Sequence, residues 1–439
     1  MKTKTRWLLA IILVGVLTLT ACSKDQEEAS TGDGESMNAT ITVQYEQDWK
    51  DHYEKAKERV LEKYPEADIQ LVEVDSFENL ETIDSTSSTN EDVPDVFALP
   101  LDRFTGLAEN DALGAIDGEK MAEELGGFGN LDDSIAHQLM LDDDYLAFPY
   151  NIETLILYIN TKNAEEQNVD TTKAMEINEL DYDNALVKIW DAWFGVGALN
   201  ATDIELLEQN DDGFASDMTA QWNELAPEKQ ETISELYNYG KKHIENNTSL
   251  FDKDASGGYI EEQMATGNAG VVTLDGPWAS GSYAKLTNDG EDLEIQPIGN
   301  LTIGGKSFKH WKGGWALGVN SRNEEDENKM TLAQEMIKEI VNPEYAADLF
   351  ESTGKILENV SAEDYENSEL SDFNKEVIKA TKESYDEAVD RPLFKEWGQV
   401  WETWENAILS WSSTKPASDE QAYEQIKASF DAMMSNIGQ

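Results

Sequence analysis

The first hundred residues alternate between strand and helix patterns, and this alternation restricts the possible folds more than any other feature. Runs rich in strand-forming residues cover Thr40–Tyr45, Ile69–Val74 and Val93–Leu99. Between the first two, apolar residues recur at intervals of four, three and four, as on one helix face that ends before Pro65: Trp49, Tyr53, Ala56 and Val60. Because strand, helix and strand at this spacing form a right-handed crossover, we predict an α/β protein with a parallel sheet covered by helices.

Two segments in the middle of the chain extend these patterns. Tyr145–Asn160 is apolar and β-branched, and it is long enough for a strand that passes from one lobe into another. Trp190–Leu250 has a mostly helical pattern, with breaks predicted at Gly195, Gly197 and Pro227. At 40% apolar residues with twelve tryptophans, the chain can bury a large core, and we expect two large lobes.

The last third of the chain is predicted to be largely helical after a strand over Trp315–Val319. The next helix has four apolar residues on its buried side: Ala333, Met336, Ile337 and Ile340. Pro343 suits the first turn of the following helix, which Gly354 would end. Large apolar residues then recur at intervals of four, three, four and three: Trp397, Trp401, Trp404, Ile408 and Trp411. Since such a stripe is usually core, we assign Trp404 and Trp411 to packing.

The N-terminus has the layout of an export signal. A positive head formed by Lys2, Lys4 and Arg6 precedes an uncharged run that is too short to span a bilayer comfortably. Residues 19–22, Leu-Thr-Ala-Cys, resemble the bacterial lipobox, which implies cleavage after residue 21 and a diacylglycerol on Cys22. The alternative is an ordinary secretory signal with an incidental cysteine. Residues 22–38 are then a flexible tether, and a lone cysteine excludes an internal disulfide.

The chain is strongly acidic, with 89 acidic against 33 basic residues and a formal charge of −56. Removal of residues 1–21, which hold three bases and no acid, would leave −59. Such a charge repels phosphate arrays, so we exclude nucleic acid and anionic lipid surfaces as partners. The acidity itself is interpreted as a solvated surface suited to a saline or alkaline exterior, rather than as a set of cation sites.

Two short motifs approach known ion-binding loops without completing them. Gly304–Ser307 resembles the end of a phosphate-binding loop, but the required first glycine is Asn300 and no helix obviously starts at its end. Asp252–Gln263 approaches a calcium loop, but its twelfth position is glutamine instead of the bidentate glutamate. We interpret Ser256 as the cap of a helix over Tyr259–Ala265, and we predict no metal site.

Catalytic motifs are weak. The four histidines show no metal-ligand spacing, and there is no Gly-x-Ser-x-Gly element: His52, His137, His243 and His310. Acid pairs suited to glycoside hydrolysis stay open, because 89 carboxylates guarantee many close pairs by chance. We predict neither catalytic residues nor a cofactor.

Four segments, in order along the chain, resemble the maltose and maltodextrin-binding proteins, the extracellular sugar-binding components of ABC importers. They are Val93–Phe104, with its Asp-Arg-Phe ending, Tyr145–Leu155, Asp275–Trp278, with its Gly-Pro-Trp turn, and Arg391–Trp401. The resemblance extends from about Thr40 to the C-terminus. It implies a periplasmic-binding-protein-like fold, α/β and two-lobed, with discontinuous lobes, a hinge and an interlobe cleft.

The resemblance also implies which residues bind a sugar. A pyranose presents an apolar C–H face and a rim of hydroxyls, so its site needs flat aromatic rings and fixed polar groups. Asp102 and Glu153 are expected to accept hydrogen bonds, and Arg103 to donate them. Trp278 and Trp401 are expected to stack on sugar rings. The alternative for Asp102 and Arg103 is a surface ion pair with each other.

Three further positions match the family more loosely. Trp193 follows an acid as in a family element of the second lobe, although the family's proline is absent. Asp48 and Trp49 occupy the place of a family sugar contact, but Trp49 equally begins a buried helix stripe. Leu99 stands where the family places a stacking tryptophan, and the acidic insert Ala201–Asp217 is not expected, so the sugar register is open.

The resemblance finally implies an architecture and partners. Chain crossings are expected near Asn151, Gly313 and Gly354. The predicted parts are a signal peptide over 1–21, a tether over 22–38, a first lobe of 39–150 plus 314–355, and a second lobe of 151–313 plus 356–439. We expect a lipid-anchored monomer on the extracellular face of the bacterial cytoplasmic membrane that delivers an oligosaccharide to ABC permease subunits. Another solute on the same fold, or a lipid-anchored glycoside hydrolase, are the alternatives.

Overall fold

The computed structural model describes residues 37–437 except 88–89, 129–130, 132–133 and 211–212. These residues belong to one compact unit, Ser36–Gln439. The export signal, Cys22 and nearly all of the proposed tether lie outside the described residues. Within the described part of the chain, no helix combines the length and the apolar character that crossing a membrane requires.

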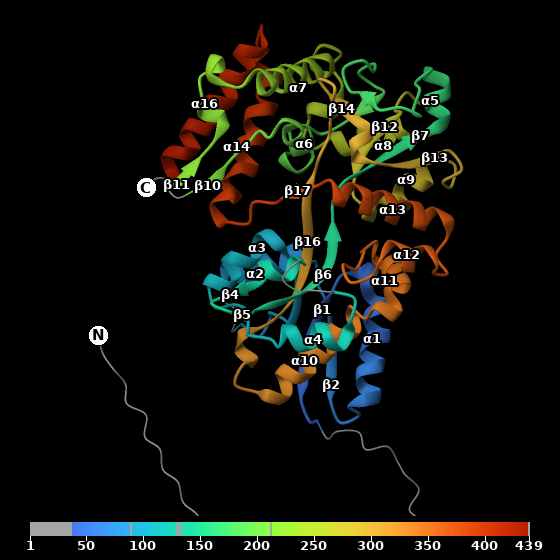
Figure 1. The fold of residues 1–439 in the computed structure, drawn as a ribbon, viewed down its shortest axis with the longest axis vertical. Coiled ribbons are helices and arrows are strands. Elements are labelled where there is room, and N and C mark those ends of the chain that lie inside the picture. The colour runs from blue at the N-terminus through green and yellow to red at the C-terminus, as the bar shows by residue number, and fades with distance from the viewer. Residues whose placement is uncertain (1–36, 88–89, 129–130, 132–133, 211–212, 438–439) are drawn as a thin grey trace, which may run out of the picture. The chain divides into compact units, whose positions relative to one another are not determined.

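The first sheet contains six strands in the order β17-β16-β3-β1-β2, with β6 paired to β16 (Figure 1). Their bounds are β1 (Thr40–Tyr45), β2 (Asp68–Glu73), β3 (Val96–Pro100), β6 (Ala147–Glu153), β16 (Trp311–Val319) and β17 (Val389–Asp390). β1 runs parallel to both β2 and β3, which confirms the predicted crossover. β16 returns from the distant end of the chain and pairs antiparallel with β3 and β6.

Helices cover this sheet because their apolar stripes match its faces. They are α1 (Lys50–Lys63), α2 (Ser76–Ser85), α3 (Leu101–Glu109), α4 (Gly118–Leu125), α10 (Glu327–Ile340) and α11 (Ala346–Thr353). The stripe predicted for α1 is buried, as is that of α10, and the two helices pack together. As expected, Pro343 begins the turn before α11, and Gly354 ends α11 in the left-handed conformation at φ +68°.

The second sheet has four strands in the order β13-β7-β12-β9. Their bounds are β7 (Ile156–Asn160), β9 (Ala185–Leu186), β12 (Val272–Asp275) and β13 (Leu293–Pro297). Smaller pairings join β4 (Met140–Leu141) with β5 (Asp144–Tyr145), β10 (Glu208–Asn210) with β11 (Gly213–Ala215), and β14 (Leu301–Ile303) with β15 (Lys306–Ser307) and β8 (Met175–Glu176). Below, the first lobe is the part built around β1, β2 and β3, and the second lobe is the part built around the second sheet.

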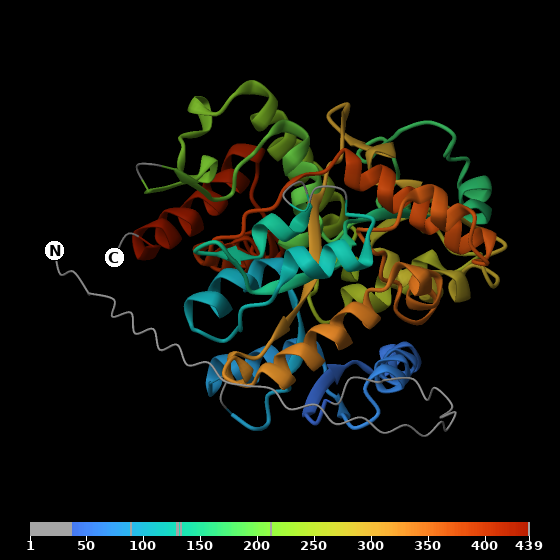
Figure 2. The ribbon, with the colours of Figure 1, turned by 60° about the horizontal axis from the view of Figure 1, so that its bottom comes forward.

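The remaining helices pack mainly in the second lobe. They are α5 (Thr161–Gln167), α6 (Ala192–Leu199), α7 (Pro227–Glu245), α8 (Ser256–Met264), α9 (Ser280–Leu286), α12 (Ala362–Glu366), α13 (Asp372–Asp386), α14 (Gly398–Leu409), α15 (Trp411–Thr414) and α16 (Asp419–Ile437). In both views α16 lies beside α14 and α7, so the C-terminus covers a segment nearly two hundred residues earlier (Figures 1 and 2).

The helix prediction for Trp190–Leu250 was wrong in two respects. Gly195 and Gly197 do not break a helix but lie inside α6. A Cβ on Gly195 would lie 2.6 Å from the Ile189 carbonyl oxygen and 3.1 Å from the Trp404 indole nitrogen, so this glycine permits close packing. Residues 201–226 are mostly not helical and include the β10–β11 hairpin. As predicted, α7 begins at Pro227. At this first helical position the backbone N–H has no partner within the helix, so proline, which lacks this N–H, loses no hydrogen bond.

The two loop motifs have structural roles. Gly304 and Gly305 form the turn between β14 and β15 at positive φ, and both of their backbone N–H groups donate to the Glu176 carboxylate. A loop whose amides already hold a carboxylate is unsuited to phosphate. Ser256 is the first residue of α8 and not its cap, whereas Asp252 Oδ1 accepts from the backbone N–H groups of Asp254 and Ala255.

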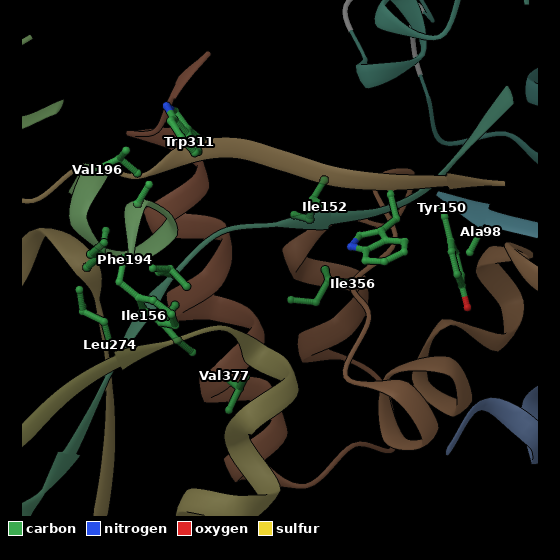
Figure 3. Packing of buried hydrophobic residues seen from close by; sticks show 14 of the residues in the cluster. Ala98, Tyr150, Ile152, Ile156, Phe194, Val196, Leu274, Trp311, Ile356 and Val377 are labelled. Atoms are coloured by element: carbon green, nitrogen blue, oxygen red, sulfur yellow. The ribbon is translucent and has the colours of Figure 1, made fainter. Parts of the chain in front are cut away.

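The lobes are joined by strands that carry the core from one sheet to the other. The strand predicted over Tyr145–Asn160 is divided, because β6 ends at Glu153 in the first sheet and β7 begins at Ile156 in the second. Ile152 forms an antiparallel bridge with Ile356, so the segment after α11 lies alongside the end of β6. Figure 3 shows the buried side chains that follow this path, from Tyr150 and Ile152 to Ile156 and Phe194.

Candidate functional site

A cavity of about 880 Å³ is lined by residues of both lobes. Seven of the eight predicted ligand-binding residues line it: Asp102, Arg103, Glu153, Trp278, Trp401, Trp193 and Trp49. The eighth, Asp48, is exposed in the short turn before α1 and lies outside the lining. The structure adds further lining residues that the sequence analysis did not assign: Glu46, Asp75, Phe77, Pro100, Gly106, Trp315, Thr353, Lys355, Arg391, Pro392, Phe394, Lys395, Trp397 and Gly398.

Asp102 and Arg391 form an ion pair that joins the start of α3 to the segment after β17. Arg391 Nη2 lies 2.7 Å from Asp102 Oδ2, and the Arg391 side chain is only 6% exposed. The other carboxylate oxygen, Oδ1, is enclosed and finds no hydrogen-bond partner among the described residues. Because an ionised carboxylate accepts several hydrogen bonds, Asp102 keeps unused acceptor capacity beside the cavity.

Arg103 points to a different partner. Its guanidinium forms an ion pair with Asp84 at the end of α2, and its side chain is one third exposed. The alternative prediction, in which Asp102 and Arg103 pair with each other, is therefore wrong. Arg103 borders the cavity while held by a neighbouring helix of the same lobe.

Glu153 and Lys355 are two partly buried charged residues in the cavity lining. Glu153 Oε2 accepts from the Trp315 indole N–H at 2.9 Å. Burial raises the pKa of the Glu153 carboxyl, although the charges of Lys355 and Arg391 oppose the shift. Burial likewise lowers the pKa of Lys355, whose ammonium lies 4.7 Å from the ring centroids of Trp49 and Trp315 and 5.0 Å from that of Tyr150. Cation–π attraction replaces part of the lost hydration of this ammonium.

Three tryptophans lie around the Arg391 guanidinium: Trp193, Trp311 and Trp401. The Arg391 guanidinium carbon lies 5.1 Å from the ring centroid of Trp193 and 5.9 Å from that of Trp401. Trp397 and Trp401 contact each other edge to face with centroids 4.7 Å apart. Trp401 stays partly exposed, whereas Trp404 and Trp411 are fully buried, which confirms their assignment to packing.

The position of Trp193 is fixed by contacts with Asp191 and His310. Asp191 caps α6 by accepting from the Trp193 backbone N–H at 2.9 Å. His310 Nε2 lies 2.7 Å from the Trp193 carbonyl oxygen, and its ring contacts the indole edge on at 4.4 Å. Burial lowers the pKa of His310 to about 3, so the imidazole is neutral near pH 7 and can donate to that carbonyl.

Trp278 is held in an open position by the turn that precedes it. Its side chain is 46% exposed although it is a large apolar group. A Cβ on Gly276 would lie 2.1 Å from the Trp278 ring, so only glycine allows the indole to fold over this residue. The Gly276 carbonyl oxygen accepts from Tyr158 at 2.7 Å, and Asp275 accepts from its N–H. These contacts fix the turn at the end of β12.

Leu99 is fully buried in the core of the first lobe and does not line the cavity. No aromatic ring is present at the place where the family resemblance implied one. Phe77 and Trp315 supply aromatic surface elsewhere in the lining. Sequence patterns did not identify them, because Phe77 is an isolated aromatic residue at a helix start and Trp315 was assigned only to a strand.

The charges of the lining balance, unlike those of the chain as a whole. Four acidic residues, Glu46, Asp75, Asp102 and Glu153, accompany four basic ones, Arg103, Lys355, Arg391 and Lys395. In the described part of the chain, no three His, Cys, Asp or Glu residues are grouped so as to hold a metal ion. A lining with no net formal charge and several aromatic rings suits an uncharged ligand with apolar faces and many hydroxyls.

Comparison with known proteins identifies relatives of this chain. A family model described as bacterial extracellular solute-binding protein matches residues 34–375. The maltodextrin-binding protein MdxE of Bacillus subtilis (strain 168) is 24% identical over 421 residues, which cover 93% of this chain and 92% of that protein. This relationship extends over nearly the whole length of both proteins.

Solved structures share the fold. The maltose-binding protein MalE from Listeria monocytogenes, in complex with maltose, superposes with a TM-score of 0.67 and 23% identity, covering 91% of this chain and 98% of that chain. MalX from Streptococcus pneumoniae, in complex with maltopentaose, gives a TM-score of 0.66 and 18% identity, covering 89% and 99%. At these identities the likeness establishes the two-lobed fold.

Proposed function

Because the chain belongs to the bacterial extracellular solute-binding proteins, we propose that it captures an oligosaccharide of the maltodextrin type in its cavity and delivers it to an ABC permease. The observation that carries this proposal is the cavity lining, in which open tryptophan faces lie beside fixed charges. Trp278 and Trp401 would stack on sugar rings, and the neighbouring carboxylates and guanidinium groups would bind the hydroxyls. The relative MdxE is itself described as a maltodextrin-binding protein, which supports the same ligand class.

The polar contacts are assigned as follows. Asp102, whose side chain is 24% exposed, offers its carboxylate as an acceptor, and Arg103 offers guanidinium N–H groups. Glu153 accepts near the junction of the lobes. Trp193 and Trp49 border the site, with Trp49 largely committed to packing because it is 5% exposed. Asp48 has no place in the proposed site.

Ligand capture is proposed to close the lobes about a hinge. The first lobe comprises residues 39–150 and 314–355, and the second 151–313 and 356–439, with crossings near Asn151, Gly313 and Gly354. The change of sheet between β6 and β7 supports the first crossing. A ligand that contacts both lobes stabilises the closed state by its differential affinity, and the closed form then docks on the permease.

Family membership places this function outside the cytoplasm, and we propose a lipid anchor on Cys22 that keeps the protein close to its permease. We further propose that it acts as a monomer, needs no cofactor and leaves the sugar chemically unchanged. The anchor is tested by Cys22→Ser, which should release the protein into the medium without altering sugar affinity. Retention of this variant on the membrane would exclude the anchor.

The ligand proposal is tested by calorimetric titration with maltotriose, maltotetraose, cellotetraose and sorbitol, followed by chromatography of each titrant. We expect one-to-one heats with the maltodextrins and unaltered sugars. Shortened products would indicate a glycoside hydrolase. Heat with only cellotetraose or sorbitol would assign the same fold to another solute.

A further inference from the structure

We propose that Phe77 and Trp315 form the sugar-stacking surface of the first lobe, with Phe77 in contact with the ligand and Trp315 as the residue that positions it. This inference rests on the proposed capture of an oligosaccharide. It assigns an aromatic platform to the lobe in which Leu99 provides none.

Phe77 is exposed and does not belong to the buried face of its helix. Its side chain is 54% exposed, and among the described residues only Leu141 and Trp278 are large hydrophobic residues of comparable exposure. Leu141 lies on the β4–β5 hairpin, whereas Phe77 and Trp278 line the same cavity. α2 packs through a different face, formed by Ser76, Asn79, Leu80 and Ile83. Phe77 therefore contributes little to the core and presents its ring to the cavity.

The backbone beneath Phe77 is fixed by a helix cap. Asp75 Oδ1 accepts from the backbone N–H groups of Phe77 and Glu78 at 2.9 and 3.1 Å. Ser76, the next residue, donates its hydroxyl to Glu46 Oε1 at 2.6 Å. An exposed aromatic ring on an ordered backbone loses little conformational freedom when a ligand binds, which favours a platform over a mobile surface group.

Trp315 holds the ring of Phe77 from behind. The two rings contact each other edge to face, with centroids 5.4 Å apart and planes at 75°. Trp315 is itself immobilised, because its indole N–H donates to Glu153 and the Lys355 ammonium lies over its ring. Only 8% of Trp315 is exposed, so it acts mainly as a wall that sets the orientation of Phe77.

Strand register explains why this platform replaces the one absent at Leu99. β16 pairs antiparallel with β3 so that Ala316 lies opposite Leu99 and Trp315 lies opposite Pro100. Successive residues of a strand point to opposite faces, so Leu99 and Ala316 enter the core while Pro100 and Trp315 line the cavity. Trp315 therefore lies one residue further along the sheet than Leu99, on the neighbouring strand.

The surroundings of Phe77 fit a neutral pyranose. Asp75 and Glu46 line the cavity on the same side and provide carboxylate acceptors. A sugar whose C–H face lies on the phenyl ring directs its hydroxyls outward toward such acceptors. The inferred subsite thus combines one apolar platform with hydrogen-bond acceptors, the same chemistry as the Trp278 side of the cavity.

The test is calorimetric titration of Phe77→Ala, Phe77→Trp and Leu141→Ala with maltotetraose. Leu141→Ala is the matched control, because it also removes an exposed apolar side chain but lies outside the cavity. We expect Phe77→Ala to weaken binding at least tenfold with an unchanged melting temperature, and Phe77→Trp and Leu141→Ala to stay within threefold of the parent. Affinity of Phe77→Ala within twofold of the parent would overturn the inference. If the parent protein binds no oligosaccharide, the proposed function fails first.

The positioning role of Trp315 is tested with a double-mutant cycle. If Trp315 acts through Phe77, Trp315→Ala weakens binding, but Phe77→Ala combined with Trp315→Ala binds no more weakly than Phe77→Ala alone. Trp315→Phe, which keeps an aromatic contact for Phe77, should recover most of the affinity. Additive losses in the double variant, or no rescue by phenylalanine, would contradict this role.

Discussion

At the scale of single residues, one tryptophan is expected to bind the ligand and another to stabilise the core. Trp278 is 46% exposed in the cavity, whereas Trp404 is fully buried and donates its indole N–H to the Ile189 carbonyl oxygen. Trp278→Ala is therefore expected to weaken sugar binding by roughly 1–3 kcal/mol while leaving the free energy of unfolding nearly unchanged. Trp404→Ala should instead reduce the free energy of unfolding by about 3–5 kcal/mol. Calorimetry and urea denaturation of both variants measure the two effects, and a reversed pattern would contradict the site assignment.

A buried carboxyl in the segment after α11 predicts a pH dependence. Glu358 Oε1 accepts from the Ile135 N–H at 2.9 Å, and burial raises the Glu358 pKa to about 7, opposed by the charges of Lys382 and His137. A raised pKa means that this group stabilises the fold below the unfolded-state pKa near 4.5 and that the contribution is lost as the pH rises through 7.

Glu358→Gln should remove this dependence. From pH 5 to pH 8, the stability of the parent protein is expected to fall relative to Glu358→Gln by about 2–3 kcal/mol. Urea denaturation of both proteins across this range measures the difference, in which the many other acidic groups cancel. If the stability of the two proteins changed equally with pH, the pKa of Glu358 would be the same in the folded and unfolded states.

Single residues also show what the sequence could and could not predict. Trp278 and Trp401 were identified from the family resemblance, and both line the cavity. Asp48 and Trp49 are adjacent, but Asp48 is exposed to solvent and Trp49 lines the cavity. The sequence did not show which of the two lines the cavity, because their directions depend on one short turn. Trp315 was missed as a lining residue because its orientation depends on Glu153, 162 residues away.

At the scale of elements, the end of α11 depends on glycine. Gly354 ends α11 at φ +68°, and a Cβ there would lie 3.0 Å from Trp278 Cα. Gly354→Ala is expected to cost about 1–2 kcal/mol of stability for the left-handed backbone alone, and to weaken sugar binding because it crowds Trp278. Thermal unfolding and calorimetry measure both effects.

Gly258→Ala is the matched control. Gly258 lies within α8 with no neighbour within 4 Å of a new Cβ, so alanine should stabilise the protein by about 0.5–1 kcal/mol and leave binding unchanged. Equal effects of the two substitutions would show that neither the φ angle nor the contact of Gly354 with Trp278 matters.

Elements with strong periodicity were predictable, and those governed by distant contacts were not. β1, α1, α10 and the end of α11 follow from spacing and capping residues that act within one or two turns. The break predicted within α6 was wrong because Gly195 lies against the indole of Trp404 and Gly197 against Phe308, so both glycines permit close packing. Apolar residues in the segment 201–226 do not recur at a regular helical or strand interval, so the sequence did not indicate its mostly non-helical structure.

At the scale of the whole molecule, the charge of −56 predicts salt-dependent stability. Repulsion among exposed carboxylates destabilises the folded state, and added ions screen it over about 10 Å at 0.1 M. The melting temperature should therefore rise by several degrees between low salt and 1 M NaCl. Calorimetric melting with sucrose as a control separates screening from general solute effects, and a flat response to NaCl would refute the explanation.

The arrangement of the lobes came from the family resemblance and not from periodicity. Local patterns indicate strands and helices. They do not indicate that β16, which follows the strands of the second sheet in the sequence, pairs with β3 and β6 of the first sheet. The charge balance of the cavity was equally hidden, because its eight charged residues lie between positions 46 and 395 of an acidic chain.

We propose that the cavity holds an oligosaccharide between aromatic surfaces of the two lobes. A crystal structure of the protein grown with maltotetraose tests this proposal. We predict sugar rings in the cavity, stacked on Trp278 and Trp401 from the second lobe and on Phe77 from the first, with hydroxyls bound by Asp102 and Arg103. An empty cavity at saturating sugar, or a sugar bound elsewhere on the protein, would contradict the account.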